Sequence, residues 1–185
     1  MYHQSSIKRL VVVATLMMVC AWASAQLLND SDLLLQPTEL LNANPAGNGN
    51  EAYIQQIGNA NEVQLVQQQE GFEANLARVL QSGDWNLAII SQTDQGNKLA
   101  LIQKGTNNYY ELSGSGSGNL LVNIQNGADN RIVQQFLNSS NVTSELVQIG
   151  NNNEIVQILE NIQGQSYSVR QIGDGLKVII HQTGF

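Results

Sequence analysis

The sequence predicts an all-β fold: a β-solenoid in which six strand-turn-strand repeats stack into two facing parallel sheets, as in amyloid. Three observations predict it. A segment of 22 to 25 residues recurs six times, a glycine stands at one fixed position in every copy, and the charged residues of the expected strands keep one parity. A period of this length indicates a solenoid, because each copy buries its apolar face only against its neighbours.

Composition already excludes several classes of protein. The chain has 185 residues, of which 12% are charged, and its formal net charge is −7. Eight Lys and Arg against fifteen Asp and Glu provide no basic surface for a phosphate backbone, so we expect no nucleic-acid partner. A single cysteine permits no disulfide framework. Asparagine and glutamine contribute 22 residues each, an amide content that needs a structural explanation.

Residues 1–25 are predicted to be a signal peptide. Lys8 and Arg9 form a basic n-region, the apolar stretch 10–22 is too short to span a bilayer, and residues 23–25 fit an A-x-A cleavage site. Cleavage between Ala25 and Gln26 removes two basic residues and no acid, so the mature chain is more acidic still.

Residues 26–50 differ in composition from the rest of the chain. They are rich in leucine, hold both prolines, Pro37 and Pro45, and close on the turn residues 48–50. Because Pro37 interrupts the only stretch with helical character, we predict an extended N-terminal leader.

The repeat domain is predicted to fill residues 51–185. Its six copies cover 51–73, 74–97, 98–119, 120–141, 142–164 and 165–185. Each copy has an anchor glutamine, a glycine two positions later, an asparagine five positions later, and a second glutamine column eleven positions later. The anchors are Gln56, Gln81, Gln103, Gln125, Gln148 and Gln171; the glycines are Gly58, Gly83, Gly105, Gly127, Gly150 and Gly173; the asparagines are Asn61, Asn86, Asn108, Asn130 and Asn153; the second column holds Gln67, Gln92 and Gln182. Leu176 replaces the last asparagine, and Gly114, Phe136 and Leu159 interrupt the second column.

Each copy holds two segments rich in Val, Ile and Leu that are bounded by turn residues, which indicates two strands and two turns. The glycine suits a turn position with positive φ or a close approach of two backbones. All ten charges within the expected strands lie at an odd distance from the anchor or asparagine column. Since side chains alternate along a strand, odd positions are predicted to face outward and even positions, including the anchors, to face the core.

Inward amides are costly, because a buried polar group without a partner loses roughly 1–3 kcal/mol. Identical amides stacked at a strand spacing of about 4.8 Å satisfy one another by forming a ladder. We therefore predict that the amide and glycine columns are structural and that they fix the register between copies.

The repeat resembles that of the curlin family. The pattern Gln-x-Gly-x-x-Asn-x-Ala/Val-x-x-x-Gln begins at Gln56 and again at Gln81, and the resemblance covers residues 51–185. Curlins are subunits of curli, the extracellular amyloid fibres of bacterial biofilms. The resemblance implies export through the general pathway, a leader that guides the chain to a dedicated outer-membrane channel, and a place on the cell surface in a fimbrium that serves adhesion. The partners it implies are the major curlin subunit, further copies, accessory secretion proteins and the outer-membrane surface.

Within the family, residues 81–92 and 102–105 are similar to the minor subunit, which nucleates the fibre. The interrupted second column and the divergent last copy agree with this assignment, whereas the acidic net charge departs from it. The major fibre subunit is the alternative, and a non-amyloid β-solenoid adhesin is a second one.

The ends of the solenoid are the candidate functional edges. The last expected strand stops three residues before Phe185, and no helix is expected to cover the first copy, so both ends offer unpaired backbone groups to an incoming chain. Arg170, Lys177 and His181 of the last copy are candidate anchoring or edge residues.

Catalysis is not expected. His181 is the only histidine of the predicted mature chain, which has no cysteine and no acidic cluster with metal-ligand spacing. The sequence therefore predicts no enzyme, no metal and no cofactor.

Overall fold

The computed structural model describes residues 10–12 and 49–184. The predicted cleavage site at Ala25 and Gln26 and most of the leader lie outside the described residues. The strands are β1 Leu10–Val12, β2 Glu51–Ile57, β3 Glu62–Gln67, β4 Leu76–Asp84, β5 Leu87–Gln92, β6 Lys98–Thr106, β7 Tyr109–Gly114, β8 Leu120–Ala128, β9 Arg131–Leu137, β10 Thr143–Ile149, β11 Glu154–Glu160, β12 Ser166–Ile172 and β13 Lys177–Thr183.

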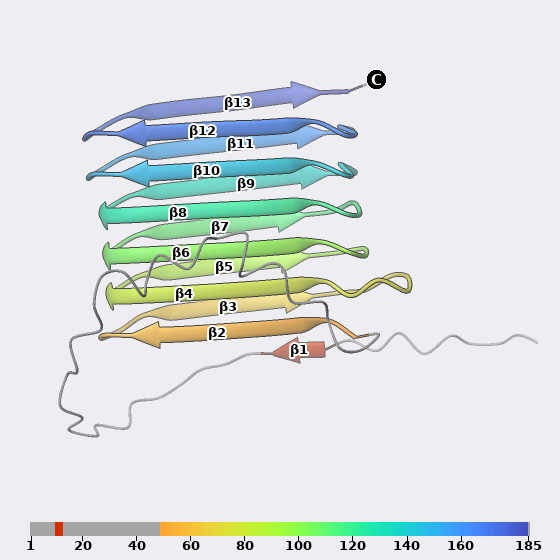
Figure 1. Ribbon diagram of the computed structural model, residues 1–185, viewed down its shortest axis with the longest axis horizontal. Helices are drawn as coiled ribbons and strands as arrows, with labels where there is room; N and C mark the ends of the chain where they lie inside the picture. The colour runs from red at the N-terminus through yellow and green to blue at the C-terminus, as the bar shows by residue number, and fades with distance from the viewer. Residues whose placement is uncertain (1–9, 13–48, 185) are drawn as a thin grey trace, which may run out of the picture.

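The strands form two sheets that stack into a solenoid of about six turns (Figure 1). The even-numbered strands lie in the order β12-β10-β8-β6-β4-β2, and the odd-numbered strands in the order β1-β3-β5-β7-β9-β11-β13. From β2 to β13 every pairing is parallel, whereas β1 pairs antiparallel with β3. The predicted all-β solenoid with two parallel sheets is confirmed.

Each coil has two turns of different regularity. The first arc joins an even-numbered strand to the next odd-numbered strand and always keeps five positions between the anchor and the asparagine column. The second arc, which leads to the next coil, spans residues 68–75, 93–97, 115–119, 138–142 and 161–165. The first of these segments is the longest, and it accounts for the longer first interval of the repeat.

The core lies between the two sheets, and its inward positions follow the predicted alternation. Leu76 and Ala100, at odd positions predicted to face outward, are also buried, in a second apolar cluster. Inward positions such as Val79, Leu101 and Ile132 are buried, while Ala52 is exposed in β2, the end strand of its sheet. The ten strand charges are all exposed or half-buried, as parity predicts: Glu51, Glu62, Arg78, Lys98, Glu111, Arg131, Glu145, Glu154, Arg170 and Lys177. Apolar alternation therefore builds a dry interior in which the inward amides must find partners.

Candidate assembly interface

The six anchor glutamines form one continuous ladder along the solenoid. Each Nε2 from Gln56 to Gln148 donates to the Oε1 of the next anchor, at distances of 2.7 to 3.1 Å. Gln81, Gln103, Gln125 and Gln148 are wholly buried. Because the register pairs these residues directly across neighbouring strands, the ladder follows from the repeat itself.

The orientation of each amide is fixed by the backbone of the facing sheet. Gln103 Nε2 also donates to the carbonyl of Leu87 at 3.1 Å, and Gln171 Nε2 to that of Glu154 at 3.1 Å. Gln81, Gln125 and Gln148 make the same contact. A carbonyl oxygen only accepts, so the amide nitrogen must face it. The ladder therefore has a direction, with its donors pointing toward the C-terminal end.

The glycine column permits the close approach of successive coils. All six glycines have φ between +109° and +131°, a region that residues with a side chain rarely adopt. In the first five, an added Cβ would overlap the carbonyl oxygen of the glycine in the next coil. At Gly173 the nearest atom to such a Cβ is Leu176 Cδ1 at 3.7 Å, because this glycine belongs to the last coil. Glycine is thus required twice over, by conformation and by space.

The asparagine column ties the first arcs together through the backbone and through direct hydrogen bonds between asparagine side chains, such as Asn108 Nδ2 to Asn86 Oδ1 at 2.9 Å. Asn108 Oδ1 accepts from the backbone N–H of Asn130 at 3.2 Å, and its Nδ2 donates to the carbonyl of Gly127 at 2.9 Å. Asn61, Asn86, Asn130 and Asn153 make the corresponding contacts. The column stops at Leu176, whose own N–H still donates to Asn153 Oδ1.

The second glutamine column is short. Gln67 Nε2 donates to Gln92 Oε1 at 2.9 Å, but Gly114 follows in register, and Gln92 Nε2 is buried without a partner in the described part of the chain. Gln182 is not part of a ladder. Its Oε1 accepts from the Tyr167 hydroxyl at 2.6 Å.

A buried polar network lies in the core beside the interrupted second column. The Tyr110 hydroxyl donates to Gln134 Oε1 at 2.8 Å and accepts from Asn123 Nδ2 at 3.0 Å. Gln134 Nε2 donates to Gln157 Oε1 at 2.8 Å. Burial raises the pKa of Tyr110 well above its ordinary value, so its hydroxyl keeps its proton. The inward parity of Gln134 and Gln157 was the signal that could have identified this network.

A further asparagine column in the second arc was also missed. Asn97 Oδ1 accepts from the N–H of Asn119 at 3.1 Å, and Asn97 Nδ2 donates to the carbonyl of Gly116 at 2.8 Å. Asn50 and Asn75 belong to the same column, which ends where Val142 follows. These residues lie six positions before each anchor, and that fixed spacing is visible in the sequence.

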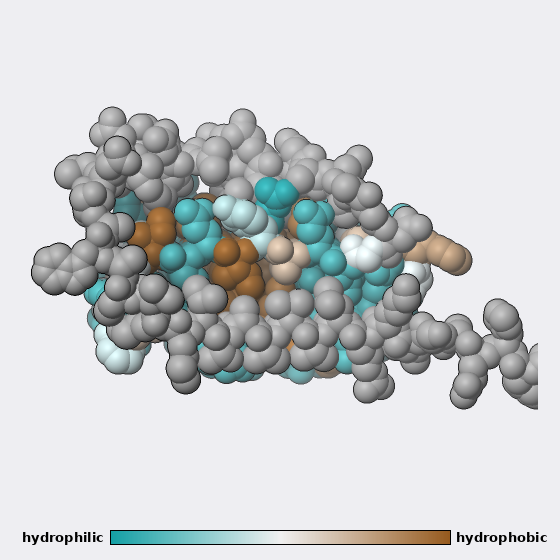
Figure 2. Space-filling view, turned by 90° about the horizontal axis from the view of Figure 1, so that it is seen from below, coloured by the Kyte–Doolittle hydropathy of each residue, from teal (hydrophilic) through white to brown (hydrophobic). Residues whose placement is uncertain are grey.

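Both ends of the stack present strand edges. Among the described strands, β12 and β13 end the two sheets on one side and β2 ends one sheet on the other, where β1 pairs with β3. Figure 2 views the stack from the side of β2, where hydrophobic and hydrophilic residues reach the surface together. The parallel ladders and the anchor glutamine ladder thus end at the same two places.

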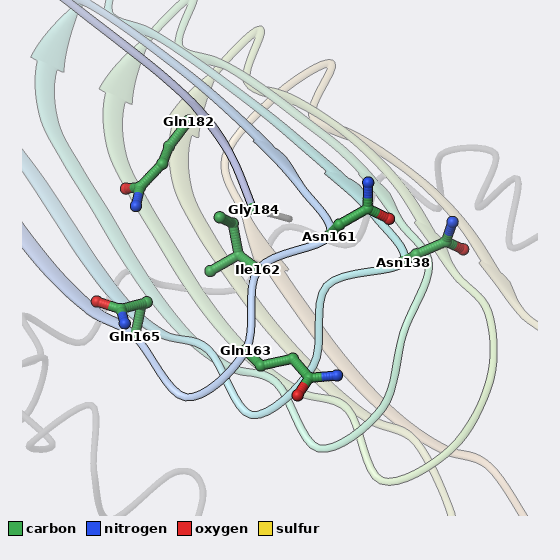
Figure 3. Close-up of a pocket in the computed structure, with 7 residues that line it drawn as sticks. All are labelled: Asn138, Asn161, Ile162, Gln163, Gln165, Gln182 and Gly184. Atoms are coloured by element: carbon green, nitrogen blue, oxygen red, sulfur yellow. The ribbon is translucent and has the colours of Figure 1, made fainter.

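The C-terminal end also carries an open hollow of about 630 Å³ (Figure 3). Amide side chains provide most of its lining, which comprises Asn138, Asn161, Ile162, Gln163, Gln165, Gln182 and Gly184. It lies at the last second arc, where the arc of a following coil would continue the stack. The hollow is therefore part of the open end and suits a polypeptide segment better than a small apolar ligand.

The three predicted edge residues lie exposed on the last coil. Lys177 Nζ is 2.6 Å from Glu154 Oε2, and His181 Nε2 is 3.8 Å from Glu160 Oε1. Arg131 Nη1 reaches the other oxygen of Glu154 at 3.1 Å. The hydrogen bond from Lys177 and the charge of Arg131 lower the pKa of Glu154 and outweigh the opposing effect of its partial burial. Arg170 projects from the neighbouring edge strand.

No group of three or more potential metal-ligating side chains occurs in the part of the chain that the structure describes. Within the same residues, no helix is long and apolar enough to cross a membrane. What the arrangement provides chemically is backbone pairing and amide pairing at two edges.

One family model matches part of the chain. Residues 73–105 match the model of the curlin associated repeat, a segment that runs from the end of the first copy through β4, β5 and β6. The match supports the curlin family and, with the solenoid, a subunit of an extracellular curli fibre. A comparison with curated protein sequences gives no match.

Proposed function

We propose that this protein is the minor, nucleating subunit of a curli fibre, which templates polymerisation of the major subunit on its exposed solenoid edges. The observation that carries the proposal is the coincidence of open strand edges and directional amide columns at the ends of the stack. An incoming chain of the same repeat extends both the backbone ladder and the amide ladder when it adds a coil. A preformed edge removes the slow step in which the first coil must form alone.

The uneven second column favours the nucleator over the major subunit. Where a regular repeat would bury glutamines, this chain buries Phe136 and Leu159, and the Tyr110 hydroxyl closes a polar network beside them. Each large buried apolar side chain contributes about 1.5–3 kcal/mol relative to exposure. A chain stabilised by its own core is able to fold before a partner arrives, and a nucleator needs this property.

A seeding experiment tests the proposal. The processed chain, folded in advance, is added in small molar fraction to a monomeric curlin with a more regular repeat, and thioflavin fluorescence is followed. We expect the lag to shorten severalfold. An unchanged lag contradicts nucleation, and rapid fibre formation by this chain alone with no effect on the partner favours the major subunit.

Edge-blocked variants supply the matched control, because the hydrogen bonds show which backbone groups face outward. The backbone N–H of Gly173 donates to the carbonyl of Ile149, so the backbone N–H groups of odd-numbered residues in β12 point toward β10. The backbone N–H of Ser168 therefore points to the open side. The backbone N–H of Gly184 donates to the carbonyl of Glu160, so even-numbered N–H groups point toward β11 and the N–H of Ile179 points to the open side. In β2 the N–H of Glu51 donates to the carbonyl of Asn75, so the N–H of Ala52 points away from β4, to the open side.

Proline at these three positions removes only outward donors, which edge strands tolerate. The Ala52→Pro, Ser168→Pro, Ile179→Pro variant should keep its circular dichroism spectrum and lose seeding. Full seeding by this folded variant would show that the β2, β12 and β13 edges are not the template.

A further inference from the structure

The two ends of the solenoid differ in the polarity of the anchor ladder. Every rung donates toward the C-terminal end, so the ladder begins with the acceptor oxygen of Gln56 and ends with the donor nitrogen of Gln171. The contact of Gln171 Nε2 with the carbonyl of Glu154 uses one amide hydrogen, and a primary amide has two. One end therefore offers a donor and the other an acceptor at the same position of the repeat.

The ends also differ in charge along one column of the outer face. The register aligns the first residues of the odd-numbered strands, in the order Glu62, Leu87, Tyr109, Arg131, Glu154 and Lys177. At the C-terminal end the signs alternate, with Glu154 held between Arg131 at 3.1 Å and Lys177 at 2.6 Å. The column thus begins with an acid at one end of the stack and finishes with a base at the other.

We propose that a second copy of this chain adds head to tail, with Lys177 of the C-terminal coil paired to Glu62 of the incoming N-terminal coil, and that this ion pair selects the register and polarity of addition. The inference rests on the proposed function, since it specifies how the edges receive a partner. Continuing the repeat across the joint sets Gln171 against Gln56 and Gln182 against Gln67, so the amide columns and the charge column meet together.

Other arrangements lose these contacts. Two C-terminal ends facing each other would run β13 antiparallel to β13 of the other copy, so Lys177 would lie across from the far end of that strand, which holds no acid, and both glutamine ladders would end in donors. A shift by one residue would set Lys177 opposite an inward-facing residue of the incoming copy and Gln171 opposite an outward-facing one. Lys177 has three N–H donors, so it is able to pair with Glu62 of the incoming copy while it keeps Glu154.

Strand β1 pairs antiparallel with β3, with Leu10 opposite Gln67 and Val12 opposite Leu65. Strand β1 belongs to the predicted signal peptide, so the processed chain presents the edge of β3 without β1. The joint therefore requires processing, and the experiment uses the chain as its exporting host releases it, with the N-terminus determined by mass spectrometry.

A two-by-two exchange of seeds and monomers tests the pair. Wild-type and Lys177→Glu seeds are each mixed with labelled wild-type or Glu62→Lys monomer at less than one monomer per seed end, so that the rates of the first addition are compared. We expect Glu62→Lys monomer to add about 2- to 5-fold more slowly than wild type to wild-type seeds, and the reversed seed to restore its rate. For each seed, the rate with wild-type monomer is divided by the rate with Glu62→Lys monomer. Comparing this ratio between the two seeds removes any effect of Lys177→Glu on its own coil next to Glu154.

Salt provides the second readout. At about 1 M NaCl, where charges are screened beyond about 3 Å, the four rates should converge if charge is the cause. Elongation in all four combinations without charge dependence, or without rescue by the reversed seed, overturns the ion pair and leaves the proposed function standing. No elongation in any combination overturns templating itself, and the joint with it.

Discussion

The two arcs of each coil solve the same stacking problem with different regularity. The first arc repeats a Gln, Gly and Asn set in every coil until Leu176, and its spacing never changes. The second arc holds its asparagines from Asn50 to Asn119, then gives way to Val142, and its length varies. The first arc therefore fixes the register between coils, while the second arc accommodates a longer segment at residues 68–75.

The largest expected contrast is between a glycine packed under the next coil and a glycine on the last coil. Gly105→Ala forces an Ala at φ +115° and drives its Cβ into the carbonyl of Gly127, which we expect to cost about 3–5 kcal/mol of unfolding free energy. Gly164→Ala, at φ +62° in the second arc of the last coil with nothing within 4 Å, should cost only about 1 kcal/mol. Guanidinium unfolding of the monomeric chain measures both, and equal losses would contradict the space requirement at Gly105.

The next contrast lies between the two glutamine columns. Gln103→Leu leaves Gln81 Nε2 without its acceptor and Gln125 Oε1 without its donor, at an expected cost of about 2–4 kcal/mol. Gln92→Leu breaks one hydrogen bond but also removes a buried nitrogen that has no partner in the described part of the chain. We expect that variant to lose less than about 1.5 kcal/mol. The same unfolding measurement decides, and a Gln92 variant as unstable as the Gln103 variant would refute the difference.

The asparagine columns should resemble each other more closely. Asn108 and Asn97 each accept a backbone N–H from the following coil and donate to a backbone carbonyl of it. Asn108→Leu and Asn97→Leu are each expected to lose about 2 kcal/mol and to slow fibre formation. If only the first-arc variant slows assembly, the first arc carries the register alone. If both leave the fibres unchanged, neither column is structural.

Sequence reasoning reached the features that repeat and missed those that interrupt the repeat. The period and the parity of charges were sufficient to predict two parallel sheets, because these depend on alternation along each strand. The direct glutamine ladder follows from register, and the positive φ of the glycines follows from the turn. The backbone contacts of Asn108 did not follow, since an inward or outward parity does not say whether an amide meets a side chain or a carbonyl.

The core network was hidden for a different reason. Tyr110, Asn123 and Gln134 come from separate strands on both sheets, and no single column contains them. They are brought together by the packing of one sheet on the other, which depends on side-chain length and not on period. The column from Asn50 to Asn119 has a constant spacing in the sequence. It precedes the anchor glutamines, so a comparison of the positions that follow each anchor does not reveal it.

The smallest expected effect is a difference in pH dependence: the contribution of the outer face to the unfolding free energy should change with pH, and that of the interior should not. Contacts with Lys177 and Arg131 hold the pKa of Glu154 below its ordinary value, so its stabilising contribution is present above the unfolded pKa, near 4.5, and is lost as the pH falls through the lowered folded pKa. Because solvent screens these charges, we expect Glu154→Gln to lower the unfolding free energy by only about 0.5 kcal/mol at pH 7.

We expect the difference in unfolding free energy between wild type and Glu154→Gln to shrink between pH 7 and about pH 3, because the carboxyl group takes up a proton first in the unfolded and then in the folded state. The cost of Gln103→Leu should stay constant over the same range, because the glutamine ladder holds no titratable group. Unfolding curves at the two pH values measure both differences. A Gln103→Leu cost that also fell with acid would mean that the ladder depends on the charges outside it, and the two faces of the sheet would then be coupled.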